Sequence, residues 1–233
     1  MGEQDKGPYQ AAWVYKDKKL AGEYDYTRYH KTKRRRRRDL ATQAAILEAL
    51  GRLENCKELL DLPCGTGRLS KLLMDAGFAY TGSDISGEMI EVARGKFDNP
   101  DDVRFVEANG EDLPFADNAF DCVVCVRFLG RIPPGPRLRI LKQLNRVSRR
   151  YLLVAAGYFG RPRPCREGLF TSLPWLFRSG AKRAKRHVIL REELDQAGWQ
   201  LDFWLPYKSC GFFSSTKTIG VYTKKDPQPV DEA

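Results

Sequence analysis

Residues 58–70 read ELLDLPCGTGRLS, and this stretch decides the fold of the chain. Its apolar start predicts a short buried strand, while Gly65 and Gly67 predict a turn that opens a helix. Glycines let such a turn come close to a ligand and adopt backbone angles that other residues resist. The first N–H groups of a helix have no partner within it, so they are available to a carboxylate or a phosphate. The stretch therefore predicts a ligand-binding turn.

Strands and helices continue to alternate along the chain as far as residue 156. Apolar runs separated by segments of helical spacing are typical of βαβ units. These units form a parallel sheet with helices on both faces, because their crossovers are right-handed. The predicted strands are residues 57–62, 79–82, 103–106, 120–126 and 151–156, followed after a helix at 190–197 by 199–205 and 216–223.

Two acidic residues indicate the type of ligand. Asp61 ends the first predicted strand, where it would repel a pyrophosphate, and Ser70 replaces the third glycine of the dinucleotide-binding motif. A carboxylate at this position instead suits a ligand with an ammonium group. Asp84 follows the second strand, where it can accept hydrogen bonds from both hydroxyls of a ribose. S-adenosylmethionine has the ammonium group, a carboxylate and the ribose.

Together with the segment GEDLPFADNAFD (110–121), these motifs make residues 57–157 resemble the class I S-adenosylmethionine-dependent methyltransferases. The stretch 61–67 is similar to the first motif of that family, with Pro63 in place of its usual small residue. The resemblance implies an α/β, Rossmann-like sheet of seven strands, mostly parallel with the last antiparallel, and helices on both faces. It also implies a methyltransferase with S-adenosylmethionine as cofactor, and it extends more weakly to the last two strands.

The resemblance assigns residues around the strand ends to cofactor and substrate. The stretch after the fourth strand lies beside the substrate in that family, so Arg127 and Arg131 are expected substrate contacts. Many relatives have histidine near positions 130 and 131, but here Gly130 and Arg131 stand there, and no general base is inherited. Expected cofactor contacts are Asp61, Pro63, Cys64, Gly65, Thr66, Gly67, Asp84, Ile85, Met89, Asn109, Gly110, Glu111 and Cys125.

A general base matters most when the methyl acceptor is a hydroxyl group. The chain has two histidines, His30 and His187, and we take both, with Tyr29, as candidate catalytic residues. The alternative for each histidine is an ordinary surface position in a charged segment. Tyr24 and Tyr26 are candidate substrate contacts, and the alternative for all three tyrosines is packing of an N-terminal helix on the core.

The net charge of +10 lies in two blocks, +6 in residues 1–40 and +7 in residues 160–192, around a nearly neutral middle. We expect a basic N-terminal extension (1–39), a methyltransferase domain (40–225) and a tail (226–233). The segment 158–189 is a basic, aromatic insert after the fifth strand, where it is positioned to cap a substrate site. Cations beside aromatic side chains suit a small or amphiphilic anionic acceptor, and RNA is the alternative.

Lys33 and the five arginines 34–38 precede a helix that the apolar spacing predicts from Asp39, with Gly51 as its C-cap. Six consecutive cations on a helix point in all directions, so we expect a solvated start with one or two arginines contacting an anion. Peripheral contact with an anionic membrane is an alternative. Loss of activity with retention of the cofactor pocket, as in a regulatory binding module, is the remaining functional alternative.

No apolar run approaches the roughly 20 residues of a membrane span, and residues 1–10 lack the pattern of a secretory signal. We therefore expect a cytoplasmic protein with reduced thiols. Cys122 and Cys125 form a CxxC motif within a predicted strand. Because side chains three residues apart on a strand face opposite sides, we expect no metal site there.

Overall fold

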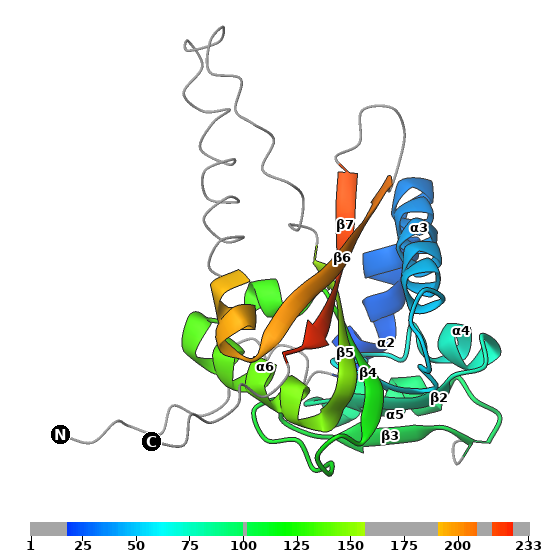
Figure 1. Cartoon of the computed structure of the whole chain (residues 1–233). Coiled ribbons are helices and arrows are strands. Elements are labelled where there is room, and N and C mark those ends of the chain that lie inside the picture. The colour runs from blue at the N-terminus through cyan, green and yellow to red at the C-terminus, as the bar shows by residue number, and fades with distance from the viewer. Residues whose placement is uncertain (1–17, 100–101, 157–190, 209–215, 226–233) are drawn as a thin grey trace, which may run out of the picture.

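A computed structural model describes residues 18–99, 102–156, 191–208 and 216–225. It contains a seven-stranded sheet in the order β3-β2-β1-β4-β5-β7-β6 (Figure 1). The first five strands pair in parallel, and β7 pairs antiparallel with both β5 and β6. This arrangement confirms the Rossmann-like fold predicted from the sequence. The strands are β1 (Glu58–Asp61), β2 (Ala79–Asp84), β3 (Arg104–Glu107), β4 (Phe120–Val126), β5 (Ser148–Ala156), β6 (Trp199–Lys208) and β7 (Thr216–Lys224).

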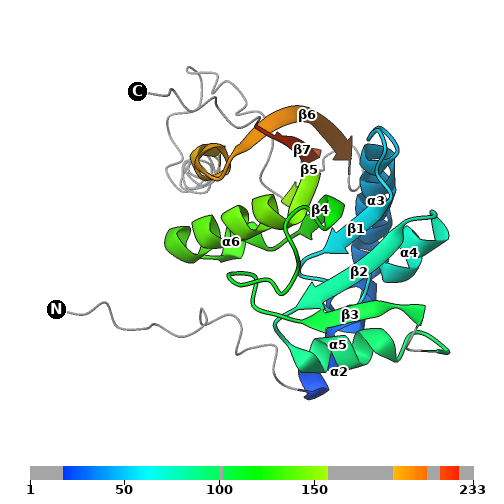
Figure 2. The same ribbon diagram turned by 60° about the horizontal axis from the view of Figure 1, so that its bottom comes forward.

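The helices lie on both faces of the sheet (Figure 2). Apolar residues of α3, α4 and α5 pack in one core with Leu59, Cys122 and Val124. On the other face, α6 and residues 191–197 pack with Leu60 and Cys125. The helices are α2 (Lys18–Asp25), α3 (Lys33–Leu50), α4 (Ser70–Asp75), α5 (Gly87–Arg94) and α6 (Pro134–Val147), with a π-helical turn at Tyr26–His30, a 3-10 turn at Leu129–Arg131 and a helical segment at 191–196.

The two cysteines of the CxxC motif face opposite sides of β4, as the sequence predicted. Cys122 contributes to the core beneath α3–α5 and Cys125 to the core beneath α6. Both thiols are completely buried, and burial raises the pKa of each. They are therefore packing residues that hold the middle strand between the two helical layers.

Helix α3 begins six residues earlier than the apolar pattern predicts. Thr32 has an extended backbone, and its hydroxyl accepts a hydrogen bond from the N–H of Arg35 at 3.2 Å, so it caps the helix at Lys33. The arginine run is therefore the first part of α3, and the helix crosses the expected domain boundary after residue 39 without a break. Among the described residues, no helix has the length and apolar character needed to cross a membrane.

A buried ion pair joins α6 to the helical segment 191–196. The Arg137 guanidinium donates to both carboxylate oxygens of Glu193 at 2.5 and 2.9 Å, and it also donates to the Ile132 carbonyl. Both side chains are about one-tenth exposed or less. A buried charge that loses its partner is costly, because neither water nor another ion compensates it.

We expect Glu193→Ala to lower the free energy of unfolding by about 3–5 kcal/mol. The matched control is Asp195→Ala in the same helical segment, whose pair with Lys225 is exposed and is expected to contribute less than about 1 kcal/mol. Urea unfolding of the two variants measures the difference. Equal losses of stability would contradict a structural role for the buried pair.

Candidate functional site

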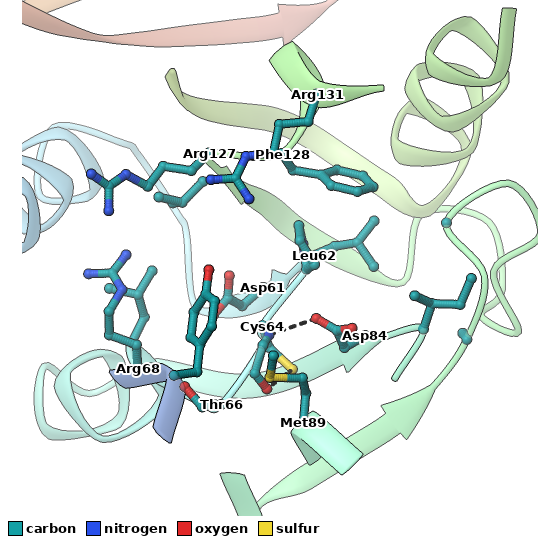
Figure 3. A pocket seen from close by; sticks show the side chains of 18 of the residues that line it. Asp61, Leu62, Cys64, Thr66, Arg68, Asp84, Met89, Arg127, Phe128 and Arg131 are labelled. Atoms are coloured by element: carbon teal, nitrogen blue, oxygen red, sulfur yellow. Dashed lines mark hydrogen bonds between the residues drawn. The ribbon is translucent and has the colours of Figure 1, made fainter. Parts of the chain in front are cut away.

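A pocket opens at the carboxyl ends of β1, β2 and β4. Its cavity volume is about 120 Å³. Figure 3 shows Cys64, Thr66 and Met89 along one side of it, and Phe128, Arg127 and Arg131 along the opposite side. Asp61 lies between the two sides. Because β1 pairs with β2 and β4, the residues that follow these three strands come together here.

The glycine turn after β1 forms the floor of the pocket. Gly65 and Gly67 have φ values of 55° and 67°, in the left-handed region that favours glycine. A Cβ at Gly67 would lie 2.9 Å from the Cβ of Ala93 in α5, whereas a Cβ at Gly65 would meet no atom within 4 Å. Gly67 thus permits close packing of the turn on α5, while Gly65 leaves room on the ligand side.

Asp61 has a buried carboxyl group, one oxygen of which has no hydrogen-bond partner among the described residues. The Tyr80 hydroxyl donates to its Oδ2 at 3.0 Å, but its Oδ1 is buried without a hydrogen-bond partner among the described residues. Burial raises the pKa of Asp61 to about 7 against the opposing effects of Tyr80 and Arg68. A buried acceptor without a partner is unfavourable, so this oxygen favours a donor or a cation in the pocket.

Asp84, at the end of β2, is hydrogen-bonded to the glycine turn. Its Oδ2 accepts a hydrogen bond from the N–H of Gly65 at 2.8 Å, and its Oδ1 accepts one from Ser86 at 3.0 Å. Burial raises the pKa of Asp84, while these backbone donors lower it in part. Each carboxylate oxygen has a second lone pair, so contacts to a ligand remain available alongside these bonds.

Some of the residues expected to contact the cofactor line the pocket, and others do not. Two of them, beyond the third strand, do not line the pocket: the side-chain Oδ1 of Asn109 accepts a hydrogen bond from the N–H of Glu111, and the Glu111 carboxylate pairs with Arg139. Cys125 and Gly67 are close to the pocket but do not line it. The expected residues that line it are Asp61, Pro63, Cys64, Gly65, Thr66, Asp84, Ile85, Met89 and Gly110.

Seven lining residues were not predicted. Each lies one or two positions from a predicted residue. The predicted ends of the strands were therefore the sequence signal that could have identified them. Arg68 lies within the glycine motif itself and was missed because the motif assigns no role to that position. The seven are Leu62, Arg68, Leu69, Ala108, Val126, Phe128 and Ile132.

The N-terminal segment contributes tyrosines to the pocket. Tyr24 and Tyr29 line it, whereas Tyr26 is 64% exposed and His30 is also exposed, and neither of these lines the pocket. The other expected catalytic residue, His187, lies outside the described residues, as does the insert 158–189. Of the two predicted catalytic residues that the structure describes, Tyr29 lines the pocket and His30 does not.

Tyr29 is held by two guanidinium groups. The Arg68 guanidinium carbon is 4.8 Å from the centre of the Tyr29 ring, and that of Arg127 is 5.4 Å from it. Cation–π contacts of this kind are favourable by roughly 0.5–2 kcal/mol. Arg68 is itself fixed by an ion pair with Asp39 at 2.8 Å. Tyr29 therefore links the glycine turn to the segment that follows β4.

Asp25 anchors the same N-terminal segment on the cofactor side. Its carboxylate accepts a hydrogen bond from the Thr66 hydroxyl at 2.6 Å and pairs with Lys96 after α5. Thr66 belongs to the glycine turn, so α2 lies directly over the loop that forms the floor of the pocket. The described part of the N-terminal extension thus contributes to the pocket wall through Tyr24 and Tyr29.

Known proteins resemble this chain in its central part. Residues 59–150 match the family model described as "Methyltransferase domain". A demethylmenaquinone methyltransferase of Clavibacter sepedonicus is 36% identical over 114 residues, covering 46% of this chain and 44% of that protein. A ubiquinone/menaquinone biosynthesis C-methyltransferase of Haemophilus ducreyi is 41% identical over 75 residues, or 29% of each chain. The chain spans less than half the length of these curated relatives.

Solved structures share the fold over most of the chain. A protein from Pyrococcus horikoshii has a TM-score of 0.64 at 19% identity, covering 87% of this chain and 99% of that chain. Magnesium protoporphyrin IX methyltransferase from Synechocystis, with bound S-adenosylmethionine, has a TM-score of 0.60 at 17% identity, covering 94% and 100%. The order of the sheet, the glycine turn and the domain match over residues 59–150 agree with the class I methyltransferase resemblance seen in the sequence, and they support it for the central part of the chain.

The two glycines of the turn provide a test of its construction. Gly65→Ala is expected to cost about 1 kcal/mol, because only backbone strain opposes it. Gly67→Ala adds a steric clash with Ala93 to the same strain and is expected to cost at least about 2 kcal/mol more. Urea unfolding measures both, with Gly22→Ala in helix α2 as a control expected to be neutral or stabilising. A smaller effect at Gly67 than at Gly65 would contradict this account.

Proposed function

We propose that the chain transfers a methyl group from S-adenosylmethionine to a small-molecule acceptor that enters beside Arg127 and Arg131. The observation that carries the proposal is the unpartnered, buried Oδ1 of Asp61 at the edge of the pocket. An ammonium group would supply the missing donor and a compensating charge. S-adenosylmethionine has such a group, and it is the cofactor that the similarity to methyltransferases suggests.

The remaining lining residues fit the other parts of this cofactor. Asp84 presents a carboxylate to ribose hydroxyls, and Ile85 and Met89 provide an apolar surface for an adenine ring. When bound, the cofactor supplies a methyl group that is activated by positively charged sulfur. Leu62, Val126 and Phe128 exclude water from the middle of the pocket. The chain would thereby act by aligning the two reactants, a contribution that reaches several kcal/mol in well-oriented reactions.

For the acceptor, we propose a small molecule with a ring and an acidic or anionic group. The names of the curated relatives associate them with quinones, and one of these names specifies methylation of carbon. Arg127 and Arg131 lie on the pocket side opposite the glycine turn. Guanidinium groups there would stabilise the ionised form of a phenol or an enol. They would thereby raise the fraction of the acceptor that is present in this more nucleophilic form. Tyr24 and Tyr29 would contact the ring.

We also propose that the described part of the N-terminal extension, residues 18–39, covers the cofactor and that the catalytic domain begins at residue 40. The anchoring of Asp25 on Thr66 supports this division of roles, since it fixes the N-terminal segment over the glycine turn. An RNA acceptor has less support, because the lining of the described pocket mixes apolar, acidic and basic residues rather than forming a continuous basic surface.

The pH dependence of cofactor binding tests the role of Asp61. Only the ionised carboxylate attracts an ammonium group, and the pKa of Asp61 is about 7. We therefore expect the affinity for S-adenosylmethionine, measured by calorimetry, to be full above pH 7. It should fall by up to about tenfold per pH unit below pH 7. Asp61→Asn should weaken binding and abolish this dependence. A pH-independent affinity in the unsubstituted protein would contradict the proposed ammonium contact.

The stability of the same variant separates binding from folding. A carboxyl group whose pKa is raised from 3.8 to about 7 by folding destabilises the folded state progressively as pH rises between these values. Asp61→Asn removes this effect, so at pH 8 its unfolding free energy should equal or exceed that of the unsubstituted protein. A large loss of stability would show that Asp61 is needed for folding.

The acceptor class is tested by transfer of a labelled methyl group. We expect label to enter the small-molecule fraction of an extract from the source organism and to be absent from its RNA. Arg131→Gln should reduce the rate by roughly tenfold or more, because a charge-assisted contact is lost. Label in RNA would overturn the acceptor assignment, and binding without transfer to any fraction would favour a regulatory module.

A further inference from the structure

A group of cations continues from the acceptor side of the pocket toward the outer strands of the sheet. It consists of Arg38 on α3, Arg127 after β4 and Lys217 on β7, and we call these three residues the cationic cluster. All three side chains are half-buried. Arg127 lines the pocket, whereas Arg38 and Lys217 lie beyond its rim. The cluster is therefore continuous with the proposed acceptor site without belonging to its lining.

Specific contacts bring the three elements together. The Thr42 hydroxyl, one turn after Arg38, donates to the Arg38 carbonyl at 2.8 Å and is 3.2 Å from the Tyr207 hydroxyl. Tyr207 on β6 is paired in register with Lys217 on β7, so the two side chains share the face of the sheet that α3 covers. Helix α3 is thus attached to the outer strands at the position of Lys217.

The charges of the cluster are not balanced by the neighbouring carboxylate. Asp39 is the acidic group beside these cations, but its Oδ1 accepts from Arg68 at 2.8 Å and its Oδ2 accepts from Gln43 at 2.7 Å. The single negative charge of Asp39 is therefore shared with Arg68, which lies outside the cluster. Three cations in a half-buried region with one shared carboxylate repel one another, an arrangement that a bound anion would relieve.

Observations at Arg38 and Lys217 show this lack of compensation, and one at Arg127 shows backbone strain. The Nε of Arg38 is buried without a hydrogen-bond partner among the described residues. Burial lowers the pKa of Lys217, and the positive charges of Arg127 and Arg38 lower it further. Arg127 has a φ of 60°, a left-handed conformation that is strained for a residue other than glycine. Strain and unpaired donors that meet at one place are typical of a binding site rather than of a packed core.

We propose that the cationic cluster binds a carboxylate or phosphate group of the methyl acceptor, and that it thereby selects anionic acceptors. This inference rests on the proposed function, since it requires the acceptor to lie beside Arg127. The acceptor ring would contact Tyr29, and its anionic group would extend past Arg127 to Lys217 and Arg38. The subsite would thus distinguish this chain from an enzyme that accepts only an uncharged ring.

The experiment measures binding of benzoate and of inorganic phosphate to the full chain saturated with S-adenosylmethionine, at constant ionic strength. Titration calorimetry gives the affinities, and thermal unfolding gives a parallel readout. The variants are Arg38→Gln and Lys217→Gln, each of which removes one charge but keeps a polar side chain. The matched control is Lys224→Gln at the other end of β7. The Lys224 ammonium group donates a hydrogen bond to Asn118, which precedes β4.

We expect at least one of the two anions to bind the unsubstituted chain and the Lys224→Gln control equally. Each cluster variant should weaken that binding by roughly tenfold, the loss expected for one charge-assisted contact. Affinity for S-adenosylmethionine should remain within about twofold in all variants, because neither Arg38 nor Lys217 lines the pocket.

Three results would overturn the inference. One is the absence of anion binding by a chain that binds S-adenosylmethionine, which leaves the proposed function intact. Another is equal anion affinity in the cluster variants and the control. The third is binding of phosphatidylglycerol vesicles or an RNA oligonucleotide, lost in the cluster variants, without binding of either small anion. Failure to bind S-adenosylmethionine at all would instead overturn the proposed function.

Discussion

The parallel pairing of β1 with β2 on one side and with β4 on the other is the constraint on which the site depends. In register, Asp61 lies opposite Gly82 on β2 and Val124 on β4. The chain therefore leaves all three strands at one edge of the sheet. Gly65, Asp84 and Arg127 follow these strand ends, and the pocket is the space between them. A change in register would separate the groups, since side chains alternate between the two faces.

The pocket has an acidic side and a basic side, and their separation follows from this topology. Asp61 and Asp84 end the neighbouring strands β1 and β2, and burial raises the pKa of both. Arg127 and Arg131 follow β4 on the opposite side. Such a division suits two reactants of opposite charge that must lie next to each other: a cationic methyl donor and an electron-rich acceptor. The guanidinium groups on Tyr29 maintain the separation, because they hold both sides at a fixed position relative to the N-terminal segment.

The basic residues of the N-terminal region differ in solvent exposure from one position to the next. Arg34–Arg37 are exposed at the start of α3, whereas Arg38 is half-buried and faces the outer strands. The exposure of Arg34–Arg37 agrees with the expected solvated start of the helix, whereas contact between an arginine of this run and an anion stays a prediction. Net charge therefore describes the site less well than the position of individual cations does.

The sequence by itself determined the fold and the cofactor side of the site. Periodicity and glycines predicted β4 at its observed bounds and the turn with Asp61 and Asp84, because these signals are local and arise from backbone geometry. The tertiary structure alone decided which distant groups meet. No local pattern indicates that Asp25 contacts Thr66, that Tyr29 is held by Arg68 and Arg127, or that Lys217 lies near Arg38. Such pairs depend on how α2 and α3 pack across the sheet, and packing is set by the shapes of whole surfaces.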